Sequence, residues 1–233
     1  MDRYVLIIDT ETANSVDQPM PYDFGWAIVD TFSKKIVETY SYVVAEIFLD
    51  KELMSQAYFA DKVPAYWEDI KANKRTLTSL INVRKTLWAS MKAYDITQVG
   101  AYNMGFDRKA SNNDIRYITG SWLRWFFPFK VDYFCIWHMA CTSILNTKEY
   151  VNFALANGFL TEKGNIKTSA ECAYRFIIDN PSFVESHTGL EDVQIEAEIL
   201  FHCLEVGDEN MKTTIYPSCW RYPQKVRKTM AVI

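Results

Sequence analysis

The hydrophobic pattern of the chain begins with an apolar run that ends in acidic residues. Residues 4–8 are Tyr-Val-Leu-Ile-Ile, and Asp9-Thr10-Glu11-Thr12 follows directly. A short apolar run bounded by polar residues is typical of a strand buried on both faces. Because side chains alternate along a strand, Asp9 and Glu11 are expected on one face while Thr10 turns to the other. The pattern therefore predicts a central strand that brings two carboxylates together at its end.

Later segments predict a mixed sheet. Turn residues and apolar spacing indicate four further strands, at 24–30, 35–44, 98–102 and 129–133. A hairpin turn between Asp30 and Lys35 joins the second and third strands, so the sheet should open as a meander. Helical spacing or capping signals predict helices at 76–93, 107–119, 134–145, 169–178 and 188–204. Together these elements predict an α/β fold with a mixed five-stranded sheet flanked by helices.

Shorter features are also expected. Residues 51–60 have a helix-like pattern, and residues 158–168 are typical of a small hairpin. Residues 168–171, Thr-Ser-Ala-Glu, have the form of a capping box that opens the next helix. Asp132 lies near the end of the short strand at 129–133 and is expected to cap the N-terminus of the apolar helix at 134–145.

Composition narrows the class of protein. The chain has 233 residues, of which 49% are hydrophobic, enough for one domain with a large core. No apolar run approaches the roughly 20 residues of a membrane span, and the first strand leaves no room for a signal peptide. A soluble, cytoplasmic protein is expected. The five cysteines are odd in number and lack a Cys-x-x-Cys pair, so core thiols are expected. The net charge of -4 argues against a broad basic surface for nucleic acid.

The first acidic pair favours a divalent metal site. Two carboxylates at the end of a hydrophobic strand repel each other unless a cation lies between them. Hard oxygen ligands suit Mg²⁺ or Mn²⁺. The same Asp-x-Glu spacing recurs at Asp50-Lys51-Glu52, where it lies in a mixed polar stretch and predicts no such site. The position of the pair after a buried strand, rather than its spacing alone, indicates the metal.

Three further residues are candidates, and each also has an ordinary structural explanation. Asp107 follows the strand at 98–102, at the edge where open α/β sheets bind ligands, but first-turn acids also favour the helix dipole. Asp192 lies in the first turn of the last helix, where residues 188–191 resemble a capping box. His187 precedes that helix, where a lone histidine is more often a surface or capping residue than a catalyst.

The order of these motifs resembles the DEDDh branch of the DEDD exonuclease superfamily, which has a ribonuclease H-like fold. The family includes polymerase proofreading exonucleases, ribonuclease T and oligoribonuclease. The resemblance covers residues 4 to about 204 of a single expected domain, 1–233, and leaves a C-terminal tail at about 205–233. The three matching motifs are Asp9-Thr10-Glu11-Thr12, Asn103-Met104-Gly105-Phe106-Asp107 and His187-Thr188-Gly189-Leu190-Glu191-Asp192.

The resemblance implies a role for each matching residue. It implies that His187 is the general base, and that two divalent ions, Mg²⁺ or Mn²⁺, are held by Asp9, Glu11, Asp107 and Asp192. An imidazole with an ordinary pKa near 6.5 suits proton transfer from water, which supports the first assignment. Two ions about 4 Å apart suit phosphodiester hydrolysis, which supports the second. The resemblance also implies that the terminal nucleotide contacts the backbone of Thr10 to Thr12, Phe106 and, nearby, Asn103.

Some segments depart from the family pattern. Many relatives have Glu-Ile-Gly in the second strand, whereas this chain has Asp23-Phe24-Gly25. The insert at 61–75 lacks a family counterpart and is a candidate flap, with a basic cluster at Lys71, Lys74 and Arg75. The tail has no counterpart either; packing of its aromatic residues with a solvated end is favoured over base stacking. Its basic and aromatic residues are Tyr216, Trp220, Arg221, Tyr222, Lys225, Arg227 and Lys228.

The expected function is hydrolysis of nucleic acid from its end. The motifs predict a metal-dependent 3′-to-5′ exonuclease that acts on a single-stranded or frayed 3′ end, with DNA favoured, and releases nucleoside 5′-monophosphates. Three alternatives stay open: an exoribonuclease, a non-catalytic nucleic-acid or polymerase-associated module, and a metallophosphatase for small molecules. The expected partner is single-stranded nucleic acid, with scope for association with replication or repair proteins and no membrane.

Overall fold

A mixed sheet forms the centre of the molecule. The computed structural model describes residues 2–15, 17–206 and 218–230. Within them, six strands follow the order β4-β3-β2-β1-β5-β6 across the sheet. Their bounds are β1 Tyr4–Ala13, β2 Met20–Asp30, β3 Lys35–Val44, β4 Thr76–Thr78, β5 Gln98–Ala101 and β6 Asp132–Cys135. The predicted α/β class and mixed sheet are confirmed, with one strand more than the sequence predicted.

The predicted central position of the first strand is confirmed. β1 pairs antiparallel with β2 on one side and parallel with β5 on the other. Residues 5–8 are fully buried because both faces of the sheet are covered at this strand. The pairing of β1 with β2 is regular up to Glu11 and shifts only between Glu11 and Thr12. The alternation of side chains therefore holds at Asp9 and Glu11, which share one face.

The additional strand is β4, which pairs parallel with β3 at the edge of the sheet. The sequence pattern placed residues 76–78 inside a helix, but the helix α4 spans Leu80–Ala93 and begins after Ser79. The Ser79 hydroxyl accepts a hydrogen bond from the Asn82 amide, which fixes this start. A three-residue strand is too short to show alternation, so only its contact with β3 reveals it.

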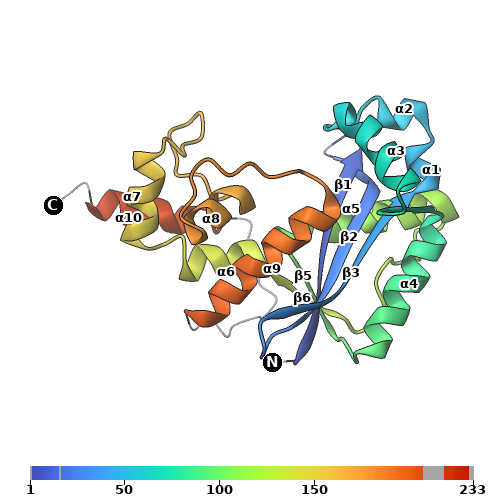
Figure 1. Cartoon of the computed structure of the whole chain (residues 1–233), viewed down its shortest axis with the longest axis horizontal. Helices are drawn as coiled ribbons and strands as arrows, with labels where there is room; N and C mark the ends of the chain where they lie inside the picture. Colours follow the sequence, from blue (N-terminus) through green and yellow to red (C-terminus); the bar gives the residue numbers. More distant parts are fainter. Residues whose placement is uncertain (1, 16, 207–217, 231–233) are drawn as a thin grey trace.

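Helices cover both faces of the sheet (Figure 1). The helices α4 and α5, Met104–Thr119, pack on the face that carries Leu6 and Ile8. On the opposite face, which carries Val5 and Ile7, lie α6, Ile136–Ser143, and α9, Gly189–Glu205. The shorter elements are α1 Ala45–Phe48, α2 Lys51–Met54, the 3-10 turn η1 Ala60–Lys62, α3 Val63–Lys71, α7 Lys148–Ala156, α8 Ala170–Ile177 and α10 Arg221–Met230.

Several local predictions need correction. Asp132 does not cap a helix: it is exposed and begins β6, and α6 starts later, with Cys135 at its N-cap. The capping residue of α8 is Ser169, one position later than the predicted box, and its hydroxyl accepts from the Cys172 amide. Only Lys51–Met54 of the helix-like 51–60 segment is α-helix. The small hairpin at 158–168 is confirmed by an antiparallel bridge between Leu160 and Ile166.

The C-terminal helix packs against the body of the domain. Tyr222, Val226 and Met230 of α10 lie against the core cluster that contains α7, α6 and α9. This agrees with the packing interpretation of the tail, although Tyr216 lies outside the described residues. All five cysteines are free and buried, as predicted. Among the described residues, no helix combines the length and apolar character needed to cross a membrane.

Candidate active site

Four carboxylates from three separate segments meet at the end of β1. Asp9 and Glu11 come from β1, Asp107 from the first turn of α5, and Asp192 from the first turn of α9. β1 and β5 are parallel neighbours, so the end of β1 and the start of α5 lie at the same sheet edge. Thr10 turns to the other side of β1, as predicted, and its hydroxyl donates to Asp107 Oδ1 over 2.9 Å.

Two glycines let α9 approach the sheet closely enough to deliver Asp192. A Cβ atom on Gly25 of β2 would lie 2.1 Å from the backbone of Gly189. A Cβ atom on Gly189 would lie 2.7 Å from the backbone nitrogen of Gly25 and 3.3 Å from the carbonyl oxygen of Asp9. Only glycine fits at such an approach of two backbones. The first turn of α9 therefore rests directly on β1 and β2.

Burial and mutual repulsion make this cluster unfavourable without a cation. Burial raises the pKa of Glu11 to about 9, with a further contribution from Asp192. It likewise raises the pKa of Asp192 to about 8 and that of Asp107 to about 7. The pKa of Asp9 lies well above its usual value for the same reason, with added repulsion from neighbouring acids, and its Oδ2 has no hydrogen-bond donor.

The donor set fits hard divalent ions. One oxygen each of Glu11 and Asp192 and a ring nitrogen of His187 lie within 4.8 Å of one another. Anionic oxygen atoms, one of them buried and without a donor, are the ligands that Mg²⁺ and Mn²⁺ prefer. The residues present are therefore suited to hold the ions that the motifs imply.

Glu196 is a further acid of this cluster, and the sequence pattern did not single it out. It lies one helical turn after Asp192 on α9 and is only 3% exposed. Burial raises its pKa well above the ordinary value, with added repulsion from Asp107, and its Oε2 has no hydrogen-bond donor. The four-residue spacing from Asp192 could have found it, because such residues share one face of a helix.

His187 lies on the loop before α9 in a constrained conformation. Its φ of 53° lies in the left-handed region, which is uncommon for residues other than glycine. The imidazole stacks on Phe59, and its Nδ1 faces Glu185 Oε2 at 3.7 Å. Burial lowers the pKa of His187, and the positive charge of Lys62 lowers it further. The ring therefore stays neutral to a lower pH than free imidazole.

Lys62 was also missed by the sequence analysis. Its ammonium group donates to the carbonyl oxygens of Ser186 and His187, the latter over 3.2 Å, and lies 4.3 Å from the centre of the Phe59 ring. Its charge also lowers the pKa values of Glu11 and Asp192, against the larger effect of burial. Lys62 lies in the insert but outside the basic cluster, so no local signal marked it.

The basic cluster of the insert is not an open binding surface. Lys71 and Lys74 are exposed, but Arg75 is only 5% exposed. Its guanidinium pairs with Asp23 at 3.2 Å, Asp69 at 3.1 Å and Glu191 at 2.8 Å. The end of the candidate flap is therefore anchored to β2 and to the first turn of α9.

Asp23 stands in the second strand where many relatives have glutamate, and it connects three elements of the fold. It is fully buried, and its Oδ2 accepts hydrogen bonds from the Tyr66 hydroxyl at 2.6 Å and the Gly189 amide at 2.9 Å. Arg75 donates to the same oxygen. Asp23 thus joins β2, α3 and the N-terminus of α9 through one carboxylate.

The residues predicted to contact the terminal nucleotide lie in β1 and at the start of α5. Thr12 follows the irregularity in β1 and is partly buried. Asn103 is exposed and precedes α5 with a φ of 83°, while Phe106 is partly exposed in the first turn of that helix.

The second Asp-x-Glu segment, Asp50-Lys51-Glu52, has a structural role. Asp50 caps α2 by accepting hydrogen bonds from the amides of Glu52 and Leu53.

Comparison with solved structures identifies the class of fold. No protein-family model matches the sequence, and no curated protein shows significant sequence similarity. The nuclease domain of 3′hExo, a DEDDh family member bound to rAMP, superimposes with a TM-score of 0.56 and 18% identity, covering 89% of this chain and 94% of that one. The chain therefore has the ribonuclease H-like fold of a known exonuclease domain, as the motifs predict.

Two other solved structures of exonucleases share this fold. A 3′-exonuclease that recognises the 3′ end of the histone mRNA stem-loop matches with a TM-score of 0.57 and 16% identity, over 89% of this chain and 84% of that one. Escherichia coli Exonuclease I in complex with a dA16 oligonucleotide matches with a TM-score of 0.53 and 15% identity. That match covers all of this chain but 46% of Exonuclease I.

Proposed function

We propose that this chain is a metal-dependent 3′-to-5′ exonuclease that acts on single-stranded or frayed ends, with DNA favoured. The observation that carries the proposal is the meeting of Asp9, Glu11, Asp107 and Asp192 beside His187, at the sheet edge of a fold shared with exonucleases. The order and spacing of the three motifs support it independently. The products would be nucleoside 5′-monophosphates.

Each residue has a role in this proposal. The four aspartate and glutamate side chains would hold two divalent ions, which would supply charge neutralisation at the phosphate and a nucleophile near neutral pH. His187 would take a proton from the attacking water. Glu185 faces its Nδ1, which leaves Nε2 for this transfer. Its lowered pKa favours the neutral, proton-accepting form at pH 7.

Exoribonuclease activity is the second candidate function. Two of the structurally similar proteins were solved with a ribonucleotide or for recognition of an mRNA stem-loop, whereas Exonuclease I was solved with a DNA oligonucleotide. Only a direct comparison of the two substrates separates these candidates.

Product analysis tests the proposal. DNA and RNA oligonucleotides labelled at the 5′ end should give a descending ladder with Mg²⁺ or Mn²⁺ and no cleavage in EDTA. Asp9→Asn should abolish cleavage, whereas Asp50→Ala should keep full activity and lose only about 1 kcal/mol of stability from its helix cap. Cleavage of a circular single strand would contradict the exonuclease assignment, and undiminished cleavage in EDTA would contradict the metal requirement.

A further inference from the structure

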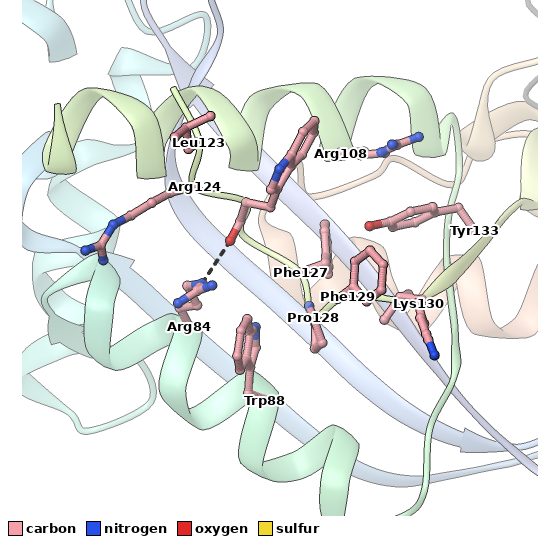
Figure 2. Close-up of a pocket in the computed structure, with 12 residues that line it drawn as sticks. Arg84, Trp88, Arg108, Leu123, Arg124, Phe127, Pro128, Phe129, Lys130 and Tyr133 are labelled. Carbon is pink, nitrogen blue, oxygen red and sulfur yellow. Dashed lines mark hydrogen bonds between the residues drawn. The ribbon is translucent and has the colours of Figure 1, made fainter. Parts of the chain in front are cut away.

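A groove on the α4 and α5 side of the molecule has an unusual lining. It encloses about 590 Å³ between these helices and the segment that leads into β6 (Figure 2). We call it the aromatic groove. Its lining residues are Arg84, Trp88, Arg108, Leu123, Arg124, Trp125, Phe127, Pro128, Phe129, Lys130, Val131 and Tyr133.

The charge of the aromatic groove is opposite to that of the chain. Four lining residues, Arg84, Arg108, Arg124 and Lys130, are cationic, and none of the lining residues is acidic. The whole chain has a net charge of -4. Across the described part of the chain, no salt bridge involves these four side chains, whereas Arg3, Arg75 and Arg175 all pair with acids. The groove is therefore a local positive site that complements an anionic ligand.

Large aromatic rings beside these cations are exposed to solvent. Phe129 is 90% exposed and Trp125 is 52% exposed, although both are large apolar side chains. Cations lie over several rings: Arg84 is 3.9 Å from the Trp88 ring centre, and Arg108 is 4.5 Å from that of Tyr133. Exposed rings interleaved with cations are the arrangement that stacks bases and contacts phosphates in single-strand binding proteins.

The segment that carries the exposed rings is held in place. Phe126 is fully buried, and its amide donates to Asn112 Oδ1 over 2.9 Å. Its carbonyl oxygen accepts from Trp88 Nε1 at 2.8 Å and from Arg84 Nε at 2.9 Å. These bonds fix the groove wall at Phe126, so a ligand would meet a surface that is preformed at this point. Such a surface costs less entropy on binding than a flexible one.

The aromatic groove is linked to the candidate active site through α5. Arg108 directly follows Asp107 in the first turn of α5, and Figure 2 shows Arg108 at one end of the groove with Arg124 toward the other. A strand whose 3′ end lies at the carboxylates could therefore continue past Arg108 into the groove. The shared helix, together with the interleaved rings and cations of the groove, favours nucleic acid over a protein or membrane partner.

We propose that the aromatic groove binds single-stranded nucleic acid on the 5′ side of the cleaved end. Bases would stack on Phe129 and Trp125, and phosphates would contact Arg124 and Lys130. This inference rests on the proposed nuclease function for its direction along the strand, but binding itself can be measured without cleavage. The groove would hold the strand while successive nucleotides are removed.

Matched variants test the groove. The groove variant combines Arg124→Gln, Phe129→Ala and Lys130→Gln. The control variant combines Lys35→Gln, Phe32→Ala and Lys85→Gln, which remove one exposed phenylalanine and two exposed cations that do not line the groove. Both are made in the full chain carrying Asp192→Ala and titrated in EDTA with a fluorescent oligothymidylate or oligouridylate of about 20 nucleotides.

The groove variant should bind at least about tenfold more weakly than the control, because it lacks one stacking platform and two cations. The slope of log K against log salt should become shallower by about 1.4, for two lost phosphate contacts on a single strand. In the otherwise wild-type chain, turnover of a small chromogenic phosphodiester should not change. If the chain cleaves nothing, the proposed function fails, but the binding measurement still decides this inference.

Three results would overturn the inference: absence of oligonucleotide binding in the Asp192→Ala parent, equal affinities for the groove and control variants, or an unchanged salt slope. Anionic lipid vesicles and an acidic peptide serve as competing ligands. If the groove variant loses binding to either of them while oligonucleotide binding is unchanged, the groove belongs to that partner instead.

Discussion

Phe59 and His187 stack with ring centres 4.5 Å apart and an angle of 13° between the rings. The two residues belong to different parts of the chain: Phe59 precedes η1, and His187 precedes α9. Lys62 adds bonds to the backbone on either side of the histidine. The histidine of the third motif is therefore positioned by a segment that belongs to none of the motifs.

Removal of this stack should slow turnover more than it weakens substrate binding. Phe59→Ala frees the imidazole to rotate, so kcat should fall about ten- to a hundredfold with little change in KM. Phe59→Tyr keeps the ring and should retain most activity. The control is Phe32→Ala, which removes an exposed phenylalanine from the turn between β2 and β3. Full kcat in Phe59→Ala would show that the stack does not position His187.

His187 should control the acidic limb of the pH–rate profile. The neutral imidazole accepts the proton, so the rate rises with pH through the pKa of His187. Because that pKa is lowered, the midpoint of this rise should lie below pH 6.5. His187→Asn should lower kcat by ~10²- to 10⁴-fold and remove this limb. Lys62→Gln should move the limb to higher pH, because it removes a charge that lowers the histidine pKa. Full rescue of His187→Asn by excess Mg²⁺ would instead identify a metal ligand.

Without metal, the protein should lose stability as the pH rises. The folded-state pKa values of Asp107, Asp192 and Glu11, about 7, 8 and 9, exceed the ordinary values near 4 of the unfolded chain. Between about pH 4 and about pH 9 the folded state binds more protons than the unfolded chain. The free energy of unfolding therefore decreases as the pH rises through this range. Melting temperatures in EDTA should follow this trend, and Mg²⁺ should reverse it. A rise in the EDTA series over this range would contradict the described cluster.

Arg75 should be essential to the fold although it lies in the apparent flap. Arg75→Met leaves the fully buried Asp23 carboxylate without its cation, which typically costs about 3–5 kcal/mol. Lys74→Met, the exposed neighbour, should have almost no effect. Urea unfolding of both variants measures the difference. Equal stabilities would show that Tyr66 and the Gly189 amide suffice to satisfy Asp23.

Local sequence signals predict the framework of this protein well. The buried run of β1 and the helical spacing of α9 depend on neighbouring residues, so both elements were found with nearly correct bounds. The two segments that contribute Asp107 and Asp192 were found by their helix-start signals and by the motif spacing. The periodicity of the sequence therefore predicts the elements that carry these acids. The sheet topology then brings the acids together.

Residues that depend on distant contacts could not be predicted in this way. Lys62 and Arg75 resemble ordinary surface cations in sequence, and only the folding of the insert onto β2 and α9 gives them roles. β4 is too short to show a period, and Asp132 has a favourable capping residue type but begins a strand instead. The aromatic groove combines two helices with a connecting segment, so no single window of the sequence describes it.

The central place of β1 has a consequence for the kinetics of folding. Asp9 meets Asp107 only after β1 pairs with β5, and meets Asp192 only after α9 docks through the Gly25–Gly189 approach. Repulsion among the carboxylates therefore develops late, and it should mainly accelerate unfolding rather than slow the folding step. Addition of Mg²⁺ should lower the unfolding rate and leave the refolding rate nearly unchanged. Stopped-flow refolding and unfolding with Mg²⁺ or EDTA would measure both rates, and a metal effect confined to refolding would show that the site assembles early.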